Sequence, residues 1–175
     1  GGADSSWYRA VAARGIYLGL DRPDIAYASK EASRWMSKPR EVDKRKLKRM
    51  GRYLKGFPRL VQTFPWQEEG LELRVYTDAD WAGCKKTRKS TSGGVIMKGD
   101  HCIKFWSKTQ ASIVTSTAEA ELVALVKGLS EAKGVASLMR DITGEDPGRV
   151  GAYTDASAAI GMVWFRGRVQ GRCDT

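Results

Sequence analysis

The sequence contains little of what several common classes of protein need. Among its 175 residues it has one histidine, His101, and three well-separated cysteines, Cys84, Cys102 and Cys173. A zinc site rich in histidine or cysteine cannot be built from this set, and the odd number of cysteines argues against a disulfide framework. Any Ser/His/Asp triad would have to use His101. We therefore expect a protein of a reducing compartment inside the cell, the cytoplasm or the nucleus.

Other signatures are also missing. The sequence has no run of about 18 apolar residues, and no basic head followed by an apolar stretch and a cleavage site, so neither a membrane span nor a secretory signal is predicted. It has neither GxGxxG nor GxxxxGK[ST], which disfavours enzymes that use nucleotide cofactors. The remaining composition, 42% hydrophobic and 29% charged, is typical of a folded domain. Because the chain begins at Gly1 rather than Met, we interpret it as a piece of a longer protein.

Basic residues are concentrated in the first third of the chain. Of a net charge of +10, residues 1–66 hold 15 Lys/Arg against 6 Asp/Glu, whereas residues 67–175 hold 15 against 14. Six basic residues lie between Lys44 and Arg52 with no acid among them. An ordinary solvated helix face is the alternative, but such a block favours contact with the phosphates of a nucleic acid. The predicted contacts are Lys44, Arg45, Lys48, Arg49 and Arg52.

Residues 1–56 have the spacing of three helices. The first starts at Ser5 or Ser6, the second starts at Asp21 or Pro23 and ends at Pro39, and the third covers Glu41 to Lys55. The apolar side of the third helix is predicted to carry Val42, Leu47, Met50, Tyr53 and Leu54. Residues 57–70 are interpreted as a linker.

From residue 71 the hydrophobic period changes to two, which predicts strands. Leu71, Leu73, Val75 and Thr77 share one face, and two turns, at residues 85–94 and 99–100, predict a meander of three antiparallel strands. A helix follows, with a capping box at Ser116 and Glu119. Residues 150–155 predict a fourth strand, and residues 157–165 a short helix. The predicted apolar stripe of the long helix is Leu122, Leu125, Val126, Leu129, Ala132 and Ala136.

The tetrapeptide Tyr-Thr-Asp-Ala occurs twice, each time at the carboxyl end of a predicted strand. If these two strands are parallel neighbours, Asp78 and Asp155 lie side by side and repel each other unless a cation lies between them. The long helix supplies a third acid, Glu119 or Glu121, which periodicity alone does not separate. A single Asp at a strand end is often a turn residue or a helix cap, but the repeat favours a site. Carboxylates without His or Cys are ligands for Mg²⁺ or Mn²⁺, and two such ions about 4 Å apart suit phosphodiester cleavage.

Long stretches of the chain resemble a known family. YTDADWAGCKKTRKSTSGG, KFWSKTQASIVTSTAEAELVAL and YTDASAAI are similar to the ribonuclease H domain of copia-type retrotransposon polyproteins. Upstream, YRAVAARGIYLGLDRPDIAYA and LKRMGRYLKG resemble the end of the preceding reverse transcriptase. The resemblance implies an α/β fold, a ribonuclease H-like mixed sheet of five strands with flanking helices, in residues 67–175. Residues 1–66 would be a small basic helical segment of the thumb or connection.

The resemblance also implies a site and its partners. Asp78, Glu121 and Asp155 would be catalytic acids that bind metal, which selects Glu121 over Glu119. The substrate would be an RNA strand paired to DNA, and the other partner the rest of the reverse transcriptase polyprotein, with no membrane. Where the family has a fourth acid and a last helix, this chain ends, so we expect truncation at the C-terminus, with Asp174 the candidate fourth acid. Asp80 receives no firm role.

Three hypotheses follow for the function. The first is a metal-dependent endonuclease that hydrolyses the RNA strand of RNA/DNA hybrids with two Mg²⁺ or Mn²⁺ ions. The second is a catalytically inactive, truncated remnant of a retroelement that binds nucleic acid. The third is a role in RNA binding or as a scaffold within a larger polyprotein. Since the aspartates of a polymerase palm are absent, no polymerase activity is expected of this piece.

Overall fold

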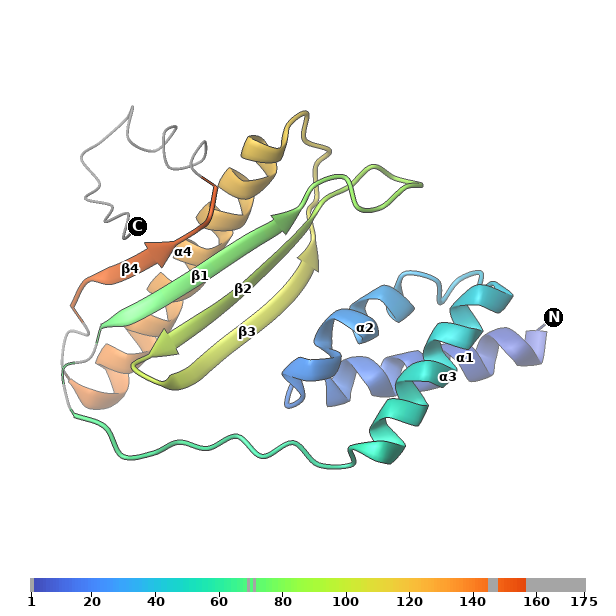
Figure 1. The fold of residues 1–175 in the computed structure, drawn as a ribbon, viewed down its shortest axis with the longest axis horizontal. Helices are drawn as coiled ribbons and strands as arrows, with labels where there is room; N and C mark the ends of the chain where they lie inside the picture. Colours follow the sequence, from blue (N-terminus) through green and yellow to red (C-terminus); the bar gives the residue numbers. More distant parts are fainter. Residues whose placement is uncertain (1, 69, 71, 145–147, 157–175) are drawn as a thin grey trace. The chain divides into compact units, whose positions relative to one another are not determined.

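The computed structural model describes residues 2–68, 70, 72–144 and 148–156 of the chain. These residues form two compact units, with the boundary between Thr63 and Phe64 (Figure 1). The first unit is helical and the second is a sheet with a long helix. Among the described residues, no helix combines the length and the apolar character needed to cross a membrane.

Three helices form the first unit: α1 (Gly2–Leu18), α2 (Pro23–Ser33) and α3 (Glu41–Gly56). Pro23 starts α2 because its fixed φ suits the first helical turn, where its missing N–H is not needed. The three predicted helices are confirmed, but two of their bounds are wrong: α1 begins at Gly2, before Ser5 and Ser6, and α2 ends at Ser33, before Pro39. Side chains at helical spacing on all three meet in one core: Tyr8, Ala12, Ile25, Ala32, Leu47 and Met50.

The predicted apolar side of α3 is wrong at two positions. Val42 and Tyr53 are exposed, whereas Asp43 is buried with Leu47 and Met50. Tyr53 lies outside the core because its hydroxyl donates to Asp24 Oδ2 at 2.9 Å. Asp43 is tolerated inside because its carboxylate is saturated with hydrogen bonds from one neighbour.

That neighbour is Arg40, the residue before the first turn of α3. Its Nε donates to Asp43 Oδ2 at 2.8 Å, a terminal nitrogen donates to Oδ1 at 3.1 Å, and its backbone N–H donates to Oδ2 at 3.1 Å. Hydrogen bonding from Arg40 holds the pKa of Asp43 below its ordinary value. The pair fixes the start of α3, and the Arg40 guanidinium lies 3.7 Å from the centre of the Trp35 ring.

The second unit is a mixed sheet of four described strands: β1 (Leu73–Asp80), β2 (Thr91–Lys98), β3 (His101–Thr109) and β4 (Val150–Tyr153). The strand order is β3-β2-β1-β4, with β1, β2 and β3 antiparallel in a meander and β4 parallel to β1. The helix α4 (Thr117–Thr143) connects β3 to β4 and covers one face (Figure 1).

Side chains of β1 alternate between the core and solvent, as the period of two predicts. Leu73, Val75, Thr77 and Ala79 are buried and the residues between them face outward. Leu73 and Val75 pack with Ile96 from β2 and Ala132 from α4 in the largest part of the core of this unit.

The buried stripe of α4 agrees with the prediction except at Val126. Leu125 and Ala132 are buried, and Leu129 and Ala136 pack against the core, whereas Val126 is exposed. Several of the most deeply buried residues of α4 are small. The reason is a close approach between helix and sheet: a Cβ built on Gly128 would lie 2.4 Å from Thr77 Cγ2. The small buried residues recur every four positions: Ala120, Ala124, Gly128 and Ala132.

The amino end of α4 forms one half of the predicted capping box, because the Glu119 carboxylate binds Thr115 instead of the Ser116 N–H. Ser116 Oγ accepts a hydrogen bond from the Glu119 N–H at 3.1 Å. At the other end, Gly144 has φ +75°, the left-handed conformation that glycine adopts at little cost.

The structure confirms the predicted fold class, an α/β fold with a mixed sheet and helices, preceded by a basic helical segment. The order strand, strand, strand, helix, strand is as predicted, although β2 and β3 are longer than expected. The fifth strand that the resemblance implies is not among the described residues. The predicted helix at residues 157–165 lies outside them.

Candidate metal centre

The two copies of Tyr-Thr-Asp-Ala lie in register on neighbouring parallel strands. Tyr76 in β1 is paired with Tyr153 in β4, and their rings stack with centroids 4.9 Å apart. Because the strands run in the same direction, the residues two positions further along each chain end at the same edge of the sheet. Asp78 and Asp155 are those residues.

Glu121 approaches the aspartates from α4. It is 4% exposed, and its Oε1 accepts a hydrogen bond from the Ala79 N–H at 3.0 Å. This bond joins the first turns of α4 to β1 immediately after Asp78. The glutamate is therefore fixed in position by the backbone of the strand that carries its neighbour.

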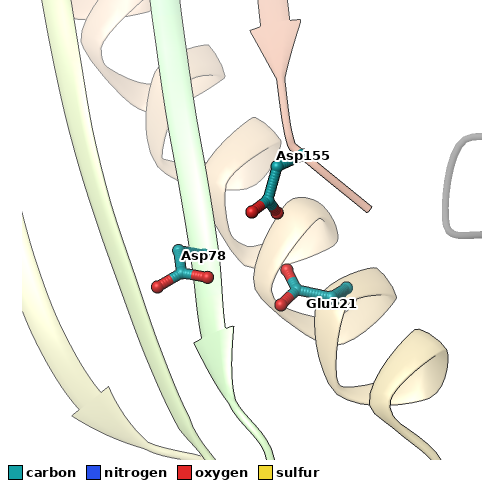
Figure 2. Close-up of side chains that lie close together, drawn as sticks. All are labelled: Asp78, Glu121 and Asp155. Carbon is teal, nitrogen blue, oxygen red and sulfur yellow. The ribbon is translucent and has the colours of Figure 1, made fainter. Parts of the chain in front are cut away.

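The three acids form one cluster. Asp78, Glu121 and Asp155 each offer a carboxylate oxygen, and these oxygens all lie within 4.8 Å of one another. Figure 2 shows the Glu121 carboxylate on the helix turned toward the two aspartates, which come from β1 and from the residues after β4. The aspartates are exposed and the glutamate is buried.

The electrostatics of the cluster favour a bound cation. Burial raises the pKa of Glu121, and repulsion from Asp78 and Asp155 adds to it, while the hydrogen bond from Ala79 opposes the increase. Glu121 Oε2 is buried without a hydrogen-bond partner among the described residues. A buried carboxylate oxygen with no donor, next to two further carboxylates, is a ligand set for a hard divalent cation. The residues present therefore fit Mg²⁺ or Mn²⁺.

Glu119, which the hydrophobic pattern did not separate from Glu121, has a different environment. Its Oε2 accepts hydrogen bonds from the Thr115 N–H at 2.7 Å and from Thr115 Oγ1 at 3.0 Å. The carboxylate thus lies at the amino end of α4, where negative charge is stabilised by the free N–H groups and the helix dipole. Of the two glutamates, Glu121 is the one that the structure places with the aspartates.

Three other residues singled out in the sequence lie apart from the cluster or outside the described residues. Asp80 is exposed beyond Asp78 on the same face of β1, and its carboxylate lies against Gly83, where a Cβ would be 1.8 Å from Oδ2. His101 Nε2 lies 2.7 Å from the Pro65 carbonyl oxygen. Asp174 falls outside the described residues, so its proposed role stays a prediction.

The predicted phosphate contacts all lie on α3 in the first unit. Lys44 is partly buried, and its Nζ lies 3.6 Å from Glu41 Oε2. The other four are exposed and form no ion pair with a described residue, so their charge is available to a ligand: Arg45, Lys48, Arg49 and Arg52.

Gln110 is a supporting residue that the sequence analysis did not identify. It is buried at the end of β3, and its Nε2 donates to Ser92 Oγ and to the Ala120 carbonyl oxygen, both at 2.9 Å. Ser92 is paired with Ala79, the residue that binds Glu121. Gln110 therefore joins the sheet to the start of α4. A single glutamine after a strand carries no pattern that would reveal this.

Comparison with known proteins shows what the chain is similar to. No protein-family model matches it. It is 37% identical over 139 residues to the retrovirus-related Pol polyprotein from transposon RE1 of Arabidopsis thaliana and 35% identical over 139 residues to that from transposon RE2 of the same plant. Each match covers 79% of this chain but 9% and 10% of the respective relative, so the chain spans about a tenth of these polyproteins.

A shorter relative is matched over most of its length. The chain is 35% identical over 131 residues to the secreted RxLR effector protein 161 of Plasmopara viticola, a match that covers 70% of the chain and 86% of the relative. Further similarity, 30% over 141 residues, is to the retrovirus-related Pol polyprotein from transposon TNT 1-94 of Nicotiana tabacum. The homologues from transposons RE1, RE2 and TNT 1-94, at 30–37% identity, are retrovirus-related Pol polyproteins from copia-type transposons, which supports the interpretation of the chain as a fragment of such a polyprotein.

Proposed function

We propose that the chain is the ribonuclease H part of a retrotransposon polyprotein and hydrolyses the RNA strand of RNA/DNA hybrids. The observation that carries the proposal is the convergence of Asp78, Glu121 and Asp155, with Glu121 Oε2 buried and without a partner. A similarity to Pol polyproteins agrees with a substrate made of nucleic acid. We further propose that the chain acts in the reducing interior of a cell, in the cytoplasm or the nucleus, because its three cysteines are well separated in sequence and odd in number.

The three carboxylates would hold two Mg²⁺ or Mn²⁺ ions. Such ions activate a water molecule and neutralise charge on the phosphate during phosphodiester cleavage. The chain's own contribution is to fix the ligands. Glu121 is oriented by the Ala79 N–H, and Asp78 and Asp155 are set side by side by the pairing of β1 and β4.

Binding of the hybrid would use the exposed basic face of α3. Arg45, Lys48, Arg49 and Arg52 would contact phosphates, with Lys44 restricted by Glu41. Such contacts carry no base specificity. The partner in the cell would be the rest of the polyprotein, and Asp174 is proposed as a fourth acid that supports the metal ions.

Cleavage of a labelled RNA/DNA hybrid in Mg²⁺, compared with EDTA, tests the proposal. Asp78→Asn, Glu121→Gln and Asp155→Asn should each remove turnover while binding of the hybrid stays intact or tightens, because negative charge is lost near phosphate. The matched control is Glu119→Gln, which changes the same kind of side chain outside the cluster and should keep most of the activity.

Two results would contradict the proposal in different ways. Binding of the hybrid without metal-dependent cleavage would support the inactive, nucleic-acid-binding remnant instead. Substantial cleavage by Asp78→Asn would show that the acids are assigned wrongly.

A further inference from the structure

The loop between β1 and β2 carries a second group of basic residues. It follows Asp80 directly and in Figure 1 extends past the arrowhead of β1, the end of the strand that carries Asp78. Because a strand advances about 3.3 Å per residue, the loop begins roughly 7 Å beyond Asp78. Four of its residues are basic: Lys85, Lys86, Arg88 and Lys89.

Internal hydrogen bonds give this loop a defined shape. The Ala82 N–H donates to Ser90 Oγ at 3.0 Å, and Ser90 is buried. Around the buried Cys84, the Arg88 N–H donates to the Cys84 carbonyl oxygen at 2.7 Å, and the Cys84 N–H donates to the Lys89 carbonyl oxygen at 3.3 Å. The loop is a folded turn that presents its charges in fixed places.

Two further bonds connect the loop to the segment that leads into α4. Lys89 Nζ donates to the Ala111 carbonyl oxygen at 2.6 Å, and Trp81 Nε1 donates to the Val114 carbonyl oxygen at 3.4 Å. The start of α4 carries Glu121. The loop is thus tied to both elements, β1 and α4, that supply acids to the cluster.

Lys85 and Arg88 are exposed, and neither side chain forms an ion pair or a hydrogen bond with a described residue. Their charges are therefore not used within the described part of the second unit. Three carboxylates repel the phosphates of a nucleic-acid backbone. Bound metal ions within the cluster and basic side chains beside it would both reduce this repulsion.

We propose that Lys85 and Arg88 bind the phosphate backbone of the nucleic-acid strand that lies over the carboxylates. The inference deepens the proposed function, since it assigns substrate contacts beside the same acids, but it concerns binding and not cleavage. Lys89, which is bonded to Ala111, holds the loop in place.

The test measures binding of a labelled 20-base-pair RNA/DNA hybrid by the whole chain in EDTA, where no metal-dependent cleavage occurs. Lys85→Gln combined with Arg88→Gln should lower the slope of log affinity against log salt by roughly 1 to 2 units, because each phosphate contact contributes about 0.9. Lys85→Arg combined with Arg88→Lys, which keeps both charges, should keep the slope.

Lys133→Gln combined with Arg140→Gln is the matched control. It removes one exposed Lys and one exposed Arg from the same unit, at least 12 residues, or about 18 Å along α4, from Glu121. Its slope should equal that of the unchanged chain. Thermal unfolding verifies that all variants fold.

Three results would overturn the inference: an unchanged slope in the Gln pair, an equal decrease in the control, or no binding of the hybrid. Failure of the proposed function is a separate result, because it would appear as missing cleavage in Mg²⁺ with the salt slopes as expected.

Discussion

Replacing Glu121 by Gln should stabilise the second unit when no divalent cation is present. Glu121 is buried, and its Oε2 has no partner among the described residues. At 4.8 Å, the largest separation between the ligand oxygens, two unit charges repel by about 0.9 kcal/mol in water and about 3.5 kcal/mol at an effective dielectric constant of 20. Because Asp78 and Asp155 are exposed, a net gain of about 1 to 3 kcal/mol at pH 7 is expected.

Glu119→Gln should have the opposite sign. This carboxylate accepts two hydrogen bonds from Thr115 at the amino end of α4, so the loss of its charge should cost about 0.5 to 1 kcal/mol. Changing Glu to Gln at these two positions of one helix should therefore have opposite effects, because the fold destabilises the charge of Glu121 and stabilises the charge of Glu119.

The pH dependence of the gain follows from the direction of the pKa shift. The pKa of Glu121 is raised in the folded chain, so the folded state is favoured while the carboxyl is protonated, and this stability is lost as pH rises through the raised pKa. Glu121→Gln should thus stabilise at pH 7 and have little effect below the ordinary value of 4.5. A divalent cation opposes this gain, because it binds the glutamate and stabilises the unchanged chain by about 1.4 kcal/mol at ten times its dissociation constant. At about 1,000 times that constant the stabilisation is about 4.1 kcal/mol, which reverses the order.

Native-state hydrogen exchange of the β1 and β2 amides in EDTA measures these differences, since these amides report on the second unit alone. Metal-free Glu121→Gln that is less stable than the unchanged chain at pH 7 would refute the reasoning. It would mean that the hydrogen bond from Ala79 outweighs the repulsion within the cluster.

Three further predictions concern other contacts. Arg45→Gln combined with Arg49→Gln should lower the slope of log affinity for the hybrid against log salt by roughly 1 to 2 units. The control, Arg9→Gln combined with Arg14→Gln on α1, should leave that slope unchanged. Equal slopes for both pairs would mean that the basic face of α3 is only solvated. Asp43→Asn should destabilise the helical unit by about 1 to 3 kcal/mol in urea unfolding followed by circular dichroism, because it breaks a buried carboxylate–Arg40 pair. Since the pKa of Asp43 is lowered, the unchanged chain should lose this advantage as pH falls below 3.8, and a constant difference would contradict the assignment. Gly128→Ala should lower the free energy of unfolding by about 1 to 3 kcal/mol, because the new Cβ would meet Thr77. Gly134→Ala on the same helix, which has open space around it, should raise the free energy of unfolding by about 0.5 to 1 kcal/mol. If thermal unfolding shows the same effect for both variants, Gly128 is not closely packed against the sheet.

The strands were predictable because their pattern depends on one strong rule. In β1 a single alternation of apolar and polar residues determines which side chains are buried, and the observed burial follows it from Leu73 to Asp80. The start of α4 at Thr117 was predictable for a similar reason, since a serine N-cap supplies a specific hydrogen bond.

The buried face of α4 was predictable from hydrophobicity only in part. Leu125 and Ala132 are buried as expected, but Val126 is exposed, and the contribution of Ala120, Ala124 and Gly128 was missed. Small residues are weak hydrophobic signals, yet they permit the closest approach of a helix to a sheet. Periodicity could not choose between Glu119 and Glu121, because both lie at the margins of the predicted stripe.

Two buried polar residues were also not predicted from the sequence. Asp43 was not expected in the core of the helical unit, and its burial depends on three donors from Arg40, three residues earlier at the start of α3. Gln110 likewise gains its role from partners on β2 and α4.

The repeated tetrapeptide was informative because the register of two parallel strands determines which of their residues lie beside each other. Tyr76 and Tyr153 stack as the last paired residues of the two strands, and Asp78 and Asp155, two residues further along each chain, bring their carboxylates together. A slip of one residue would turn one aspartate toward the buried face, where its charge would cost several kcal/mol. The pairing that keeps both aspartates in solvent is thus also the pairing that brings them together, and Glu121, fixed by Ala79, adds a third negative charge. Repulsion within such a cluster is relieved by a proton on Glu121 or by a cation between the three acids.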